Sequence, residues 1–264
     1  MSTYFGPVLT NAPSAASFVA NYQQHGFNSA VVVTGWGIDN GWDGARRKLV
    51  ADNVGELIIR STVGDPSNRN TLWFPFAHTL VEEFRPWVAV KPNVLLAVGN
   101  EPDVVWERPD VMTFHDKEEA IWVYRYWLDD AERNLRREFP GVRLIAPSPR
   151  VGVPGWQRWL DIMADVLGRF DILSAHVYGW HRLATVYGQD TDQFPLIRDY
   201  YNRRFPGKPV AITEMGIHDV NQPASQKLAH YRQFAKGLPA NWRWALFYHY
   251  NARKDIDKEY AVLP

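Results

Sequence analysis

The chain has 264 residues, 46% of them hydrophobic, so it is long enough to bury a large core. Lysine plus arginine and aspartate plus glutamate each total 29, and no long run of one sign occurs, so the basic footprint that nucleic acid or an anionic membrane needs is missing. Cysteine is absent, which excludes disulfides, thiol catalysis and cysteine-based zinc sites.

Aromatic residues make up 14% of the chain and include 12 tryptophans. Tryptophan is large and costly to leave exposed, so this surplus suggests that some rings line a binding surface while most pack in the core. Trp127 and Trp159 fall on apolar helical faces and are expected in the core.

The N-terminal segment MSTYFGPVLT lacks the basic and apolar regions of a signal peptide, and no apolar run approaches the roughly 18 residues of a membrane span. We therefore expect one soluble domain over residues 1–264, with a monomer favoured and the compartment left open. The lack of cysteine fits a reducing compartment as well as an exported protein without bridges.

Eight short β-rich apolar runs alternate with longer helical patterns along the chain. The predicted strands are Tyr4–Leu9, Ala30–Thr34, Leu57–Ser61, Val94–Gly99, Arg143–Ala146, Ile172–Val177, Val210–Thr213 and Trp244–Tyr248. Apolar spacings of three and four predict helices over Glu118–Phe139 and Trp156–Leu167. A further helix begins near Pro223, with Asn221 as its N-cap.

Strands that alternate with helices indicate βαβ units and a parallel sheet, and eight of them in a chain of this length favour an α/β (β/α)8 TIM barrel. A doubly wound open sheet is the main alternative, but no glycine-rich phosphate turn follows any strand. Only 13 residues with little apolar periodicity follow Asn251, so the last helix is expected to be short or missing.

Two carboxylates end predicted strands, where TIM barrels gather their active sites. The fourth strand runs LLAVGNEPD and ends at Asn100 and Glu101, and the seventh runs PVAITEMG and presents Glu214. Such a pair suits a retaining glycosidase, in which one carboxyl donates a proton and the other, roughly 5–5.5 Å away, attacks the anomeric carbon.

Other strand ends supply partners for this pair. Arg60 ends the third strand and would hold a carboxylate ionised, while His176 and Tyr178 share one face of the sixth strand. Aromatic rings near the strand ends would stack on sugars, and the candidates are Trp36, Trp106, Trp180 and Tyr248.

The segments VGNEPD, AHVY and ITEMG together resemble the clan A retaining glycoside hydrolases, from about residue 30 to residue 250. The resemblance implies a (β/α)8 barrel with Glu101 as acid/base and Glu214 as nucleophile. It also implies that Asn100 binds the sugar 2-hydroxyl and that His176 and Tyr178 flank the nucleophile. Within the clan, the spacing is most similar to the small β-1,3-glucanases of glycoside hydrolase family 128.

Each residue also has a structural interpretation. Glu101 could complement a helix dipole, Glu214 could be an ordinary loop carboxylate, and Arg60 could neutralise Asp65. His176 could hydrogen-bond to another residue of the site rather than contact the substrate directly. Scattered histidines raise the question of a metal, but no HxH or HExxH spacing supports one.

The sequence therefore predicts a retaining glycoside hydrolase that acts on a β-linked poly- or oligosaccharide, with β-glucan favoured. It needs no cofactor or metal, its partner is a carbohydrate, and action on extracellular polysaccharide is plausible. The alternatives are a catalytically inactive glycan-binding barrel and a metal-dependent barrel hydrolase or isomerase. A serine hydrolase is disfavoured because GxSxG is absent.

Overall fold

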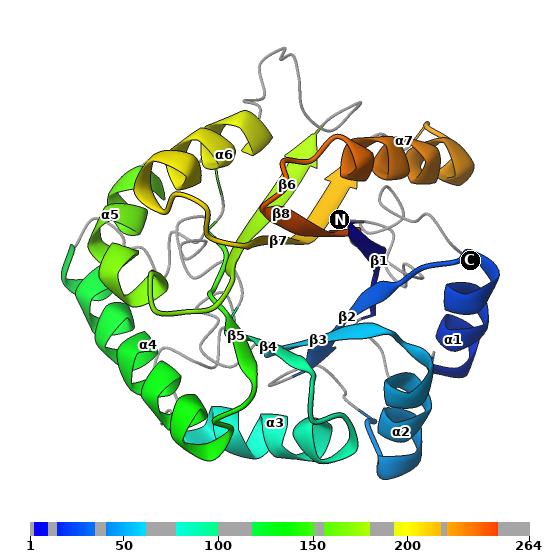
Figure 1. Ribbon diagram of the computed structural model, residues 1–264, viewed down its shortest axis with the longest axis horizontal. Coiled ribbons are helices and arrows are strands. Elements are labelled where there is room, and N and C mark those ends of the chain that lie inside the picture. Colours follow the sequence, from blue (N-terminus) through cyan, green and yellow to red (C-terminus); the bar gives the residue numbers. More distant parts are fainter. Residues whose placement is uncertain are drawn as a thin grey trace.

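The computed structural model describes residues 3–9, 15–34, 41–61, 78–99, 118–149, 151, 156–179, 193–217 and 221–247. Eight parallel strands within these residues form the centre of the molecule (Figure 1). They are β1 (Tyr4–Leu9), β2 (Ser29–Thr34), β3 (Glu56–Ser61), β4 (Leu95–Ala97), β5 (Arg143–Ile145), β6 (Leu173–Gly179), β7 (Val210–Ile217) and β8 (Trp242–Phe247).

The strand order β5-β4-β3-β2-β1-β8-β7-β6 is that of a barrel cut between β5 and β6. A parallel bridge between Ile145 and Ile172 brings the end of β5 against the start of β6 and completes the ring. Ala146 N donates to Ile172 O at 2.9 Å beside this bridge. The (β/α)8 prediction is confirmed.

One helix follows each of the first seven strands and lies on the outside of the ring (Figure 1). The described helices are α1 (Ala15–Gln24), α2 (Gly44–Asn53), α3 (His78–Val90), α4 (Glu118–Glu138), α5 (Trp156–Leu167), α6 (Gln193–Arg204) and α7 (Ala224–Lys236). None of them is long and apolar enough to cross a membrane. The segment after β8, where a short or missing helix was expected, lies outside the described residues.

The predicted cap of α7 is wrong. Pro223, not Asn221, occupies the N-cap position, and no side-chain cap hydrogen bond is formed there. The Pro223 carbonyl instead accepts from Gln226 N at 2.9 Å and Lys227 N at 3.1 Å. The fixed φ of proline, here −56°, is already suited to entering a helix.

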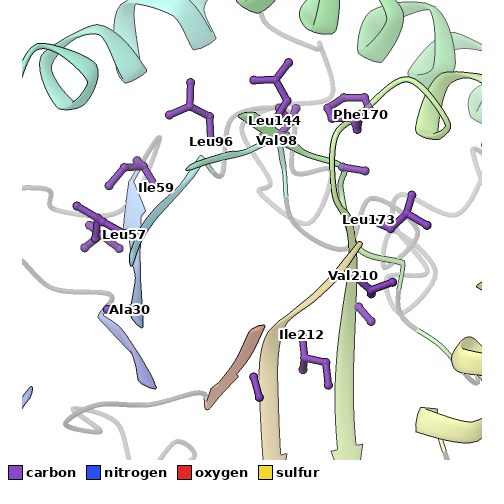
Figure 2. Packing of buried hydrophobic residues seen from close by; sticks show 14 of the residues in the cluster. Ala30, Leu57, Ile59, Leu96, Val98, Leu144, Phe170, Leu173, Val210 and Ile212 are labelled. Atoms are coloured by element: carbon purple, nitrogen blue, oxygen red, sulfur yellow. The ribbon is translucent and has the colours of Figure 1, made fainter. Parts of the chain in front are cut away.

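Alternation along the strands divides the core into two layers. One set of side chains points outward and packs against the helices, and the residues labelled in Figure 2 belong to this set, including Ile59 of β3, Leu96 of β4 and Ile212 of β7. The other set, such as Ile58 and Leu95, fills the barrel interior. A side chain's layer therefore shows which way it faces.

The interior is closed at the end where the strands begin. Trp244 of β8 is fully buried and stacks on Tyr4 of β1 with ring centroids 5.6 Å apart. The guanidinium groups of Arg143 and Arg243 lie 5.8 and 5.2 Å from the centroid of the Trp244 ring. Because this aromatic and cationic packing fills the barrel where the strands begin, an active site is expected at the opposite end, where the strands finish.

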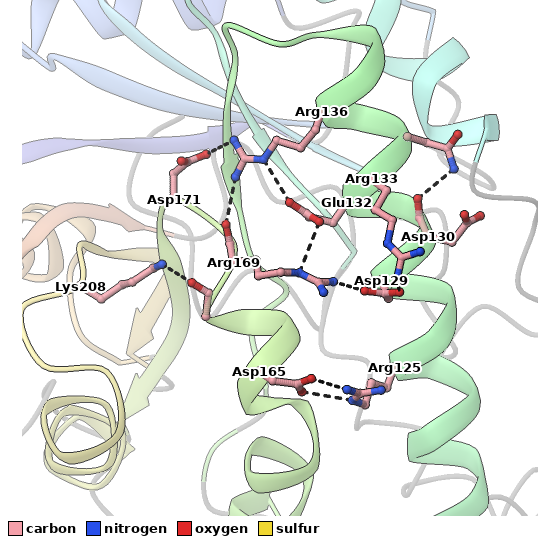
Figure 3. Close-up of polar contacts among 12 residues, drawn as sticks. Arg125, Asp129, Asp130, Glu132, Arg133, Arg136, Asp165, Arg169, Asp171 and Lys208 are labelled. Carbon is pink, nitrogen blue, oxygen red and sulfur yellow. Dashed lines mark hydrogen bonds and ion pairs between the residues drawn. The ribbon is translucent and has the colours of Figure 1, made fainter.

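An ion-pair network ties α4 to the start of β6 on the outside of the barrel (Figure 3). Glu132 Oε1 forms an ion pair with Arg136 Nε at 3.1 Å, and Glu132 Oε2 lies 3.5 Å from Arg169 Nε. Arg136 Nη1 also forms an ion pair with Asp171 Oδ2 at 2.9 Å. Asp171 lies two residues before β6 begins. The network therefore stabilises the framework near the strand beginnings, away from the strand ends.

Candidate active site

Glu214 lies at an irregularity of β7. On the β6 side, Ala175 is paired with Ile212, but the next β6 residue, His176, is paired with Glu214. The ladder with β8 also shifts register, between Ile212 and Met215. Relative to both neighbours, β7 thus carries one extra residue next to Glu214, which is a β-bulge.

The bulge determines which way the glutamate faces. Ile212 belongs to the outer layer, and so do Met215 and Ile217, whereas Ala211 belongs to the interior. Regular alternation from Ile212 would put Glu214 on the outer face as well. The extra residue reverses the alternation, so Glu214 lies on the interior face.

Three side chains from two other strands reach the Glu214 carboxyl. Arg60 Nη2 of β3 forms an ion pair with Oε1, and the Tyr178 hydroxyl of β6 donates a hydrogen bond to Oε2. His176 Nδ1 lies 3.6 Å from Oε2, and its Nε2 lies 3.4 Å from Arg60 Nη1. The side chains of Arg60, His176 and Glu214 are 5%, 2% and 7% exposed, so the cluster is shielded from water.

This environment sets the charge of Glu214. Burial is the largest influence and by itself would raise the pKa of the carboxyl. The charge of Arg60, the neighbouring His176 and the Tyr178 hydrogen bond together outweigh it, so the pKa of Glu214 lies below its ordinary value of 4.5. The carboxylate is therefore ionised at neutral pH although it is buried.

The positions of these side chains follow from their strands. Arg60 comes after outward-facing Ile59 and so points inward, while His176 and Tyr178 are two residues apart and share the inner face of β6. Since β3 is not adjacent to β6 or β7 in the sheet, Arg60 meets Glu214 across the barrel interior.

The structure thus brings together four of the residues singled out from the sequence: Arg60, His176, Tyr178 and Glu214. The other candidates lie outside the described residues, and they are Asn100, Glu101, Trp36, Trp106, Trp180 and Tyr248. Asp65, suggested as another partner for Arg60, is also outside them. Trp127 and Trp159 are 9% and 2% exposed, which confirms their place in the core.

The chain leading to Asn100 and Glu101 is described as far as Gly99. Gly99 has φ +71°, in the left-handed region that favours glycine. A Cβ at this position would lie 3.1 Å from the Tyr124 hydroxyl oxygen. Both the backbone conformation and the close approach of Tyr124 therefore require glycine immediately before the predicted Asn-Glu pair.

Glu83 of α3 is a polar residue near the strand ends that the sequence did not single out. Its carboxyl accepts hydrogen bonds from Thr34, the last residue of β2, and from Ser61, the last residue of β3. The residue keeps some exposure, but its carboxyl is enclosed, and burial raises its pKa to about 7 despite the two hydroxyl donors, which lower it. A signal existed: Glu83 lies three residues after buried Leu80 and four before buried Trp87, on the apolar face of the helix.

Within the described ranges, no three histidine, aspartate or glutamate side chains are grouped so that they could hold a metal ion. The described cluster consists of an ionised carboxylate with cationic and hydroxyl partners.

No protein-family model matches the chain, and no curated protein matches it in sequence. Solved structures do resemble it. A β-mannanase from the blue mussel Mytilus edulis superposes with a TM-score of 0.57 at 11% identity, covering 98% of this chain and 90% of the mannanase. A GH26 β-mannanase from Bacteroides ovatus gives a TM-score of 0.58 at 14% identity, covering 100% of this chain and 85% of the other.

A calcium-binding mutant of Bacteroides uniformis β-glucuronidase 2 gives a TM-score of 0.70 at 12% identity, covering 99% of this chain. This chain spans only 32% of the glucuronidase chain. At identities this low the likeness concerns the fold. The chain is a TIM barrel, similar in fold to these mannanases and to one part of a β-glucuronidase.

Proposed function

We propose that this protein is a glycoside hydrolase that cleaves a β-linked poly- or oligosaccharide with retention of configuration. The observation that carries the proposal is the Glu214 carboxylate, which is buried on the inner face of the barrel and kept ionised by Arg60 and Tyr178. A carboxylate in this state is suited to attack an anomeric carbon. The glycosidase names of the structures with a similar fold support the same reaction class.

In the proposed first step, Glu214 attacks the anomeric carbon while Glu101 donates its proton to the departing glycosidic oxygen. A covalent glycosyl-enzyme forms and the leaving sugar departs as an alcohol. Glu101, now ionised, takes a proton from water, and the resulting hydroxyl displaces Glu214 from the anomeric carbon. Two displacements at one carbon retain the configuration. Asn100 is proposed to bind the sugar 2-hydroxyl.

The contacts of Glu214 suit this cycle. Arg60 and Tyr178 stabilise the negative carboxylate before attack and after hydrolysis, when the charge is present. During attack that charge passes into the new ester bond, so the ion pair weakens as the bond forms. The cluster therefore balances two needs: enough stabilisation to keep Glu214 ionised, and enough remaining reactivity for attack.

The substrate class rests on the resemblance to clan A enzymes and on the aromatic content. A β-1,3-glucan is our first candidate, as the similarity to family 128 suggests. Aromatic rings would stack on the apolar faces of the sugars, and the proposed platforms are Trp36, Trp106, Trp180 and Tyr248.

The first experiment offers the purified protein laminarin (a β-1,3-glucan), cellulose, mannan and xylan, and follows the products by NMR. We expect hydrolysis of at least one polysaccharide, with the β-anomer formed first and then mutarotating. Binding without turnover on every polymer would support the inactive glycan-binding barrel. Activity that a chelator abolishes would support the metal-dependent alternative.

The second experiment removes the nucleophile. Glu214→Ala should lose turnover almost completely, and azide should restore it by taking the vacated position and giving a glycosyl azide of inverted configuration. Glu82→Ala is the matched control, because Glu82 is a 67% exposed carboxylate on α3 and should keep full activity. Near-normal turnover by Glu214→Ala on every accepted substrate would refute the assignment.

A further inference from the structure

Glu83 joins the ends of two neighbouring strands. The Thr34 hydroxyl donates to its Oε1, and the Ser61 hydroxyl donates to its Oε2 at 2.9 Å. Thr34 and Ser61 are register partners in the β2–β3 ladder and are the last residues of their strands. One carboxyl therefore holds both strand ends at the edge of the sheet where the candidate site lies.

The helix that carries Glu83, α3, is firmly packed into the core. Leu80 and Phe84 of α3 are fully buried and Trp87 is 2% exposed. The Trp87 ring packs edge-on against Trp42, with centroids 5.0 Å apart. Because α3 is anchored by these contacts, a hydrogen bond from Glu83 fixes a strand end relative to the rest of the core.

Ser61 lies at the end of the described part of β3. The described pairing between β3 and β4 reaches Arg60 and Ala97, whereas the pairing with β2 continues to Ser61. The hydrogen bond from Ser61 to Glu83 therefore holds β3 at the point where the strand ends.

Arg60 is directly attached to this point. Ser61 faces outward to Glu83, and Arg60, one residue earlier, faces inward to Glu214 and His176. A shift of the Ser61 backbone would therefore move the Arg60 guanidinium relative to Glu214. A buried ion pair depends strongly on such geometry, because its attraction offsets the cost of burying both charges only when the contacts are well made.

We propose that Glu83 is a positioning residue of the candidate active site: through Ser61 it fixes Arg60, and through Arg60 it keeps Glu214 ionised. The proposal rests on the proposed function only in treating Glu214 as the nucleophile. Glu83 itself acts through hydrogen bonds rather than through charge, since no cationic partner contacts it among the described residues.

The test measures the ionisation of Glu214 directly and needs no substrate. Protein labelled with ¹³C at the glutamate side-chain carboxyl is titrated by NMR, and the Glu214 signal is identified by its loss in Glu214→Gln. Glu83→Ala should raise the Glu214 midpoint by at least about half a unit, a fraction of the 1–3 units that a neighbouring arginine provides. Ser61→Ala should shift it in the same direction by less.

Two variants serve as controls. Glu83→Gln should keep the wild-type midpoint, because its amide can accept from one hydroxyl and donate to the other. Glu132→Ala removes a buried carboxylate from the ion-pair network near the strand beginnings, so it should lower stability without moving the midpoint. This pair separates positioning from a general loss of stability.

An unchanged Glu214 midpoint in folded Glu83→Ala would overturn the proposal, and so would an equal shift in Glu132→Ala. If Glu83→Ala does not fold, Ser61→Ala decides by the same criterion. A wild-type protein that hydrolyses no glycoside would contradict the proposed function, yet the coupling between Glu83 and Glu214 would still be measurable. The two failures can therefore be told apart.

Discussion

Replacing Arg60 with methionine tests the electrostatics of the cluster. The Arg60 and Glu214 side chains are 5% and 7% exposed, so their ion pair is buried. Methionine preserves an unbranched chain but removes the charge. The Glu214 carboxyl then remains buried without the cation that stabilised its ionised form.

The structure sets the size of the expected effect. Breaking a buried ion pair on one side costs about 3–5 kcal/mol when the remaining group stays charged. The carboxyl can limit this loss by taking up a proton. The ordinary pKa of a glutamate is 4.5, which is 2.5 pH units below pH 7. At 1.36 kcal/mol per pH unit, protonating the carboxyl at pH 7 therefore costs about 3.4 kcal/mol. We therefore expect Arg60→Met to lose about 3 kcal/mol of unfolding free energy at pH 7.

The same reasoning predicts opposite pH dependences. In the wild type the pKa of Glu214 is lowered, so its stabilising contribution is present above 4.5 and is lost as the pH falls through the native pKa. In Arg60→Met, burial raises the pKa, and the native state holds a proton that the unfolded state releases. The stability of the variant relative to wild type should therefore fall as the pH rises from about 4.5 to 7.

Urea denaturation followed by tryptophan fluorescence at pH 5 and pH 7 measures both quantities. The double variant Arg60→Met/Glu214→Gln is the control, since it removes both charges and should recover most of the deficit at pH 7. The reasoning is refuted if Arg60→Met matches wild-type stability at both pH values. It is equally refuted if the double variant is no more stable than the single one.

Three further substitutions have defined outcomes. Burial raises the pKa of Glu83 to about 7, so its contribution to stability is fullest below pH 4.5 and declines as the pH rises to 7. In urea titrations, Glu83→Gln should therefore lose less unfolding free energy than wild type when the pH is raised from 5 to 8. Gly99→Ala should cost about 1–2 kcal/mol, seen as a lower thermal midpoint, because of its φ of +71° and the Tyr124 hydroxyl; an unchanged midpoint would contradict this. Trp244→Ala should cost about 3–5 kcal/mol in urea denaturation because it removes a fully buried ring stacked on Tyr4, and a loss below about 1 kcal/mol would contradict that packing.

The sequence predicted the barrel because its signals are local. Tyr4–Leu9 and Trp156–Leu167 match the observed β1 and α5 at both ends, since apolar periodicity and neighbouring turn residues define them. The end of β7 was placed at Thr213, four residues early, because the polar Glu214 interrupts the apolar run. That interruption marks the candidate site, where a buried polar group is stabilised by partners from distant strands.

Glu83 shows where local reasoning stops. Its place on the apolar face of α3 can be recognised from the helical spacing of the apolar residues around it. Its partners Thr34 and Ser61, however, lie 49 and 22 residues away in the sequence. Hydroxyl groups at strand ends carry no pattern that points to a particular helix. Only packing of α3 against the ends of β2 and β3 brings the three together.

By itself, the sequence determined the order of strands and helices and placed Arg60, His176 and Tyr178 near strand ends, because period and composition are properties of the chain alone. The direction of Glu214 was decided by the tertiary structure. All eight residues of VAITEMGI are buried, so the segment has no polar alternation to show which side chains face the interior. Pairing with β6 and β8 introduces the extra residue that turns Glu214 inward, and such a register exists only between strands.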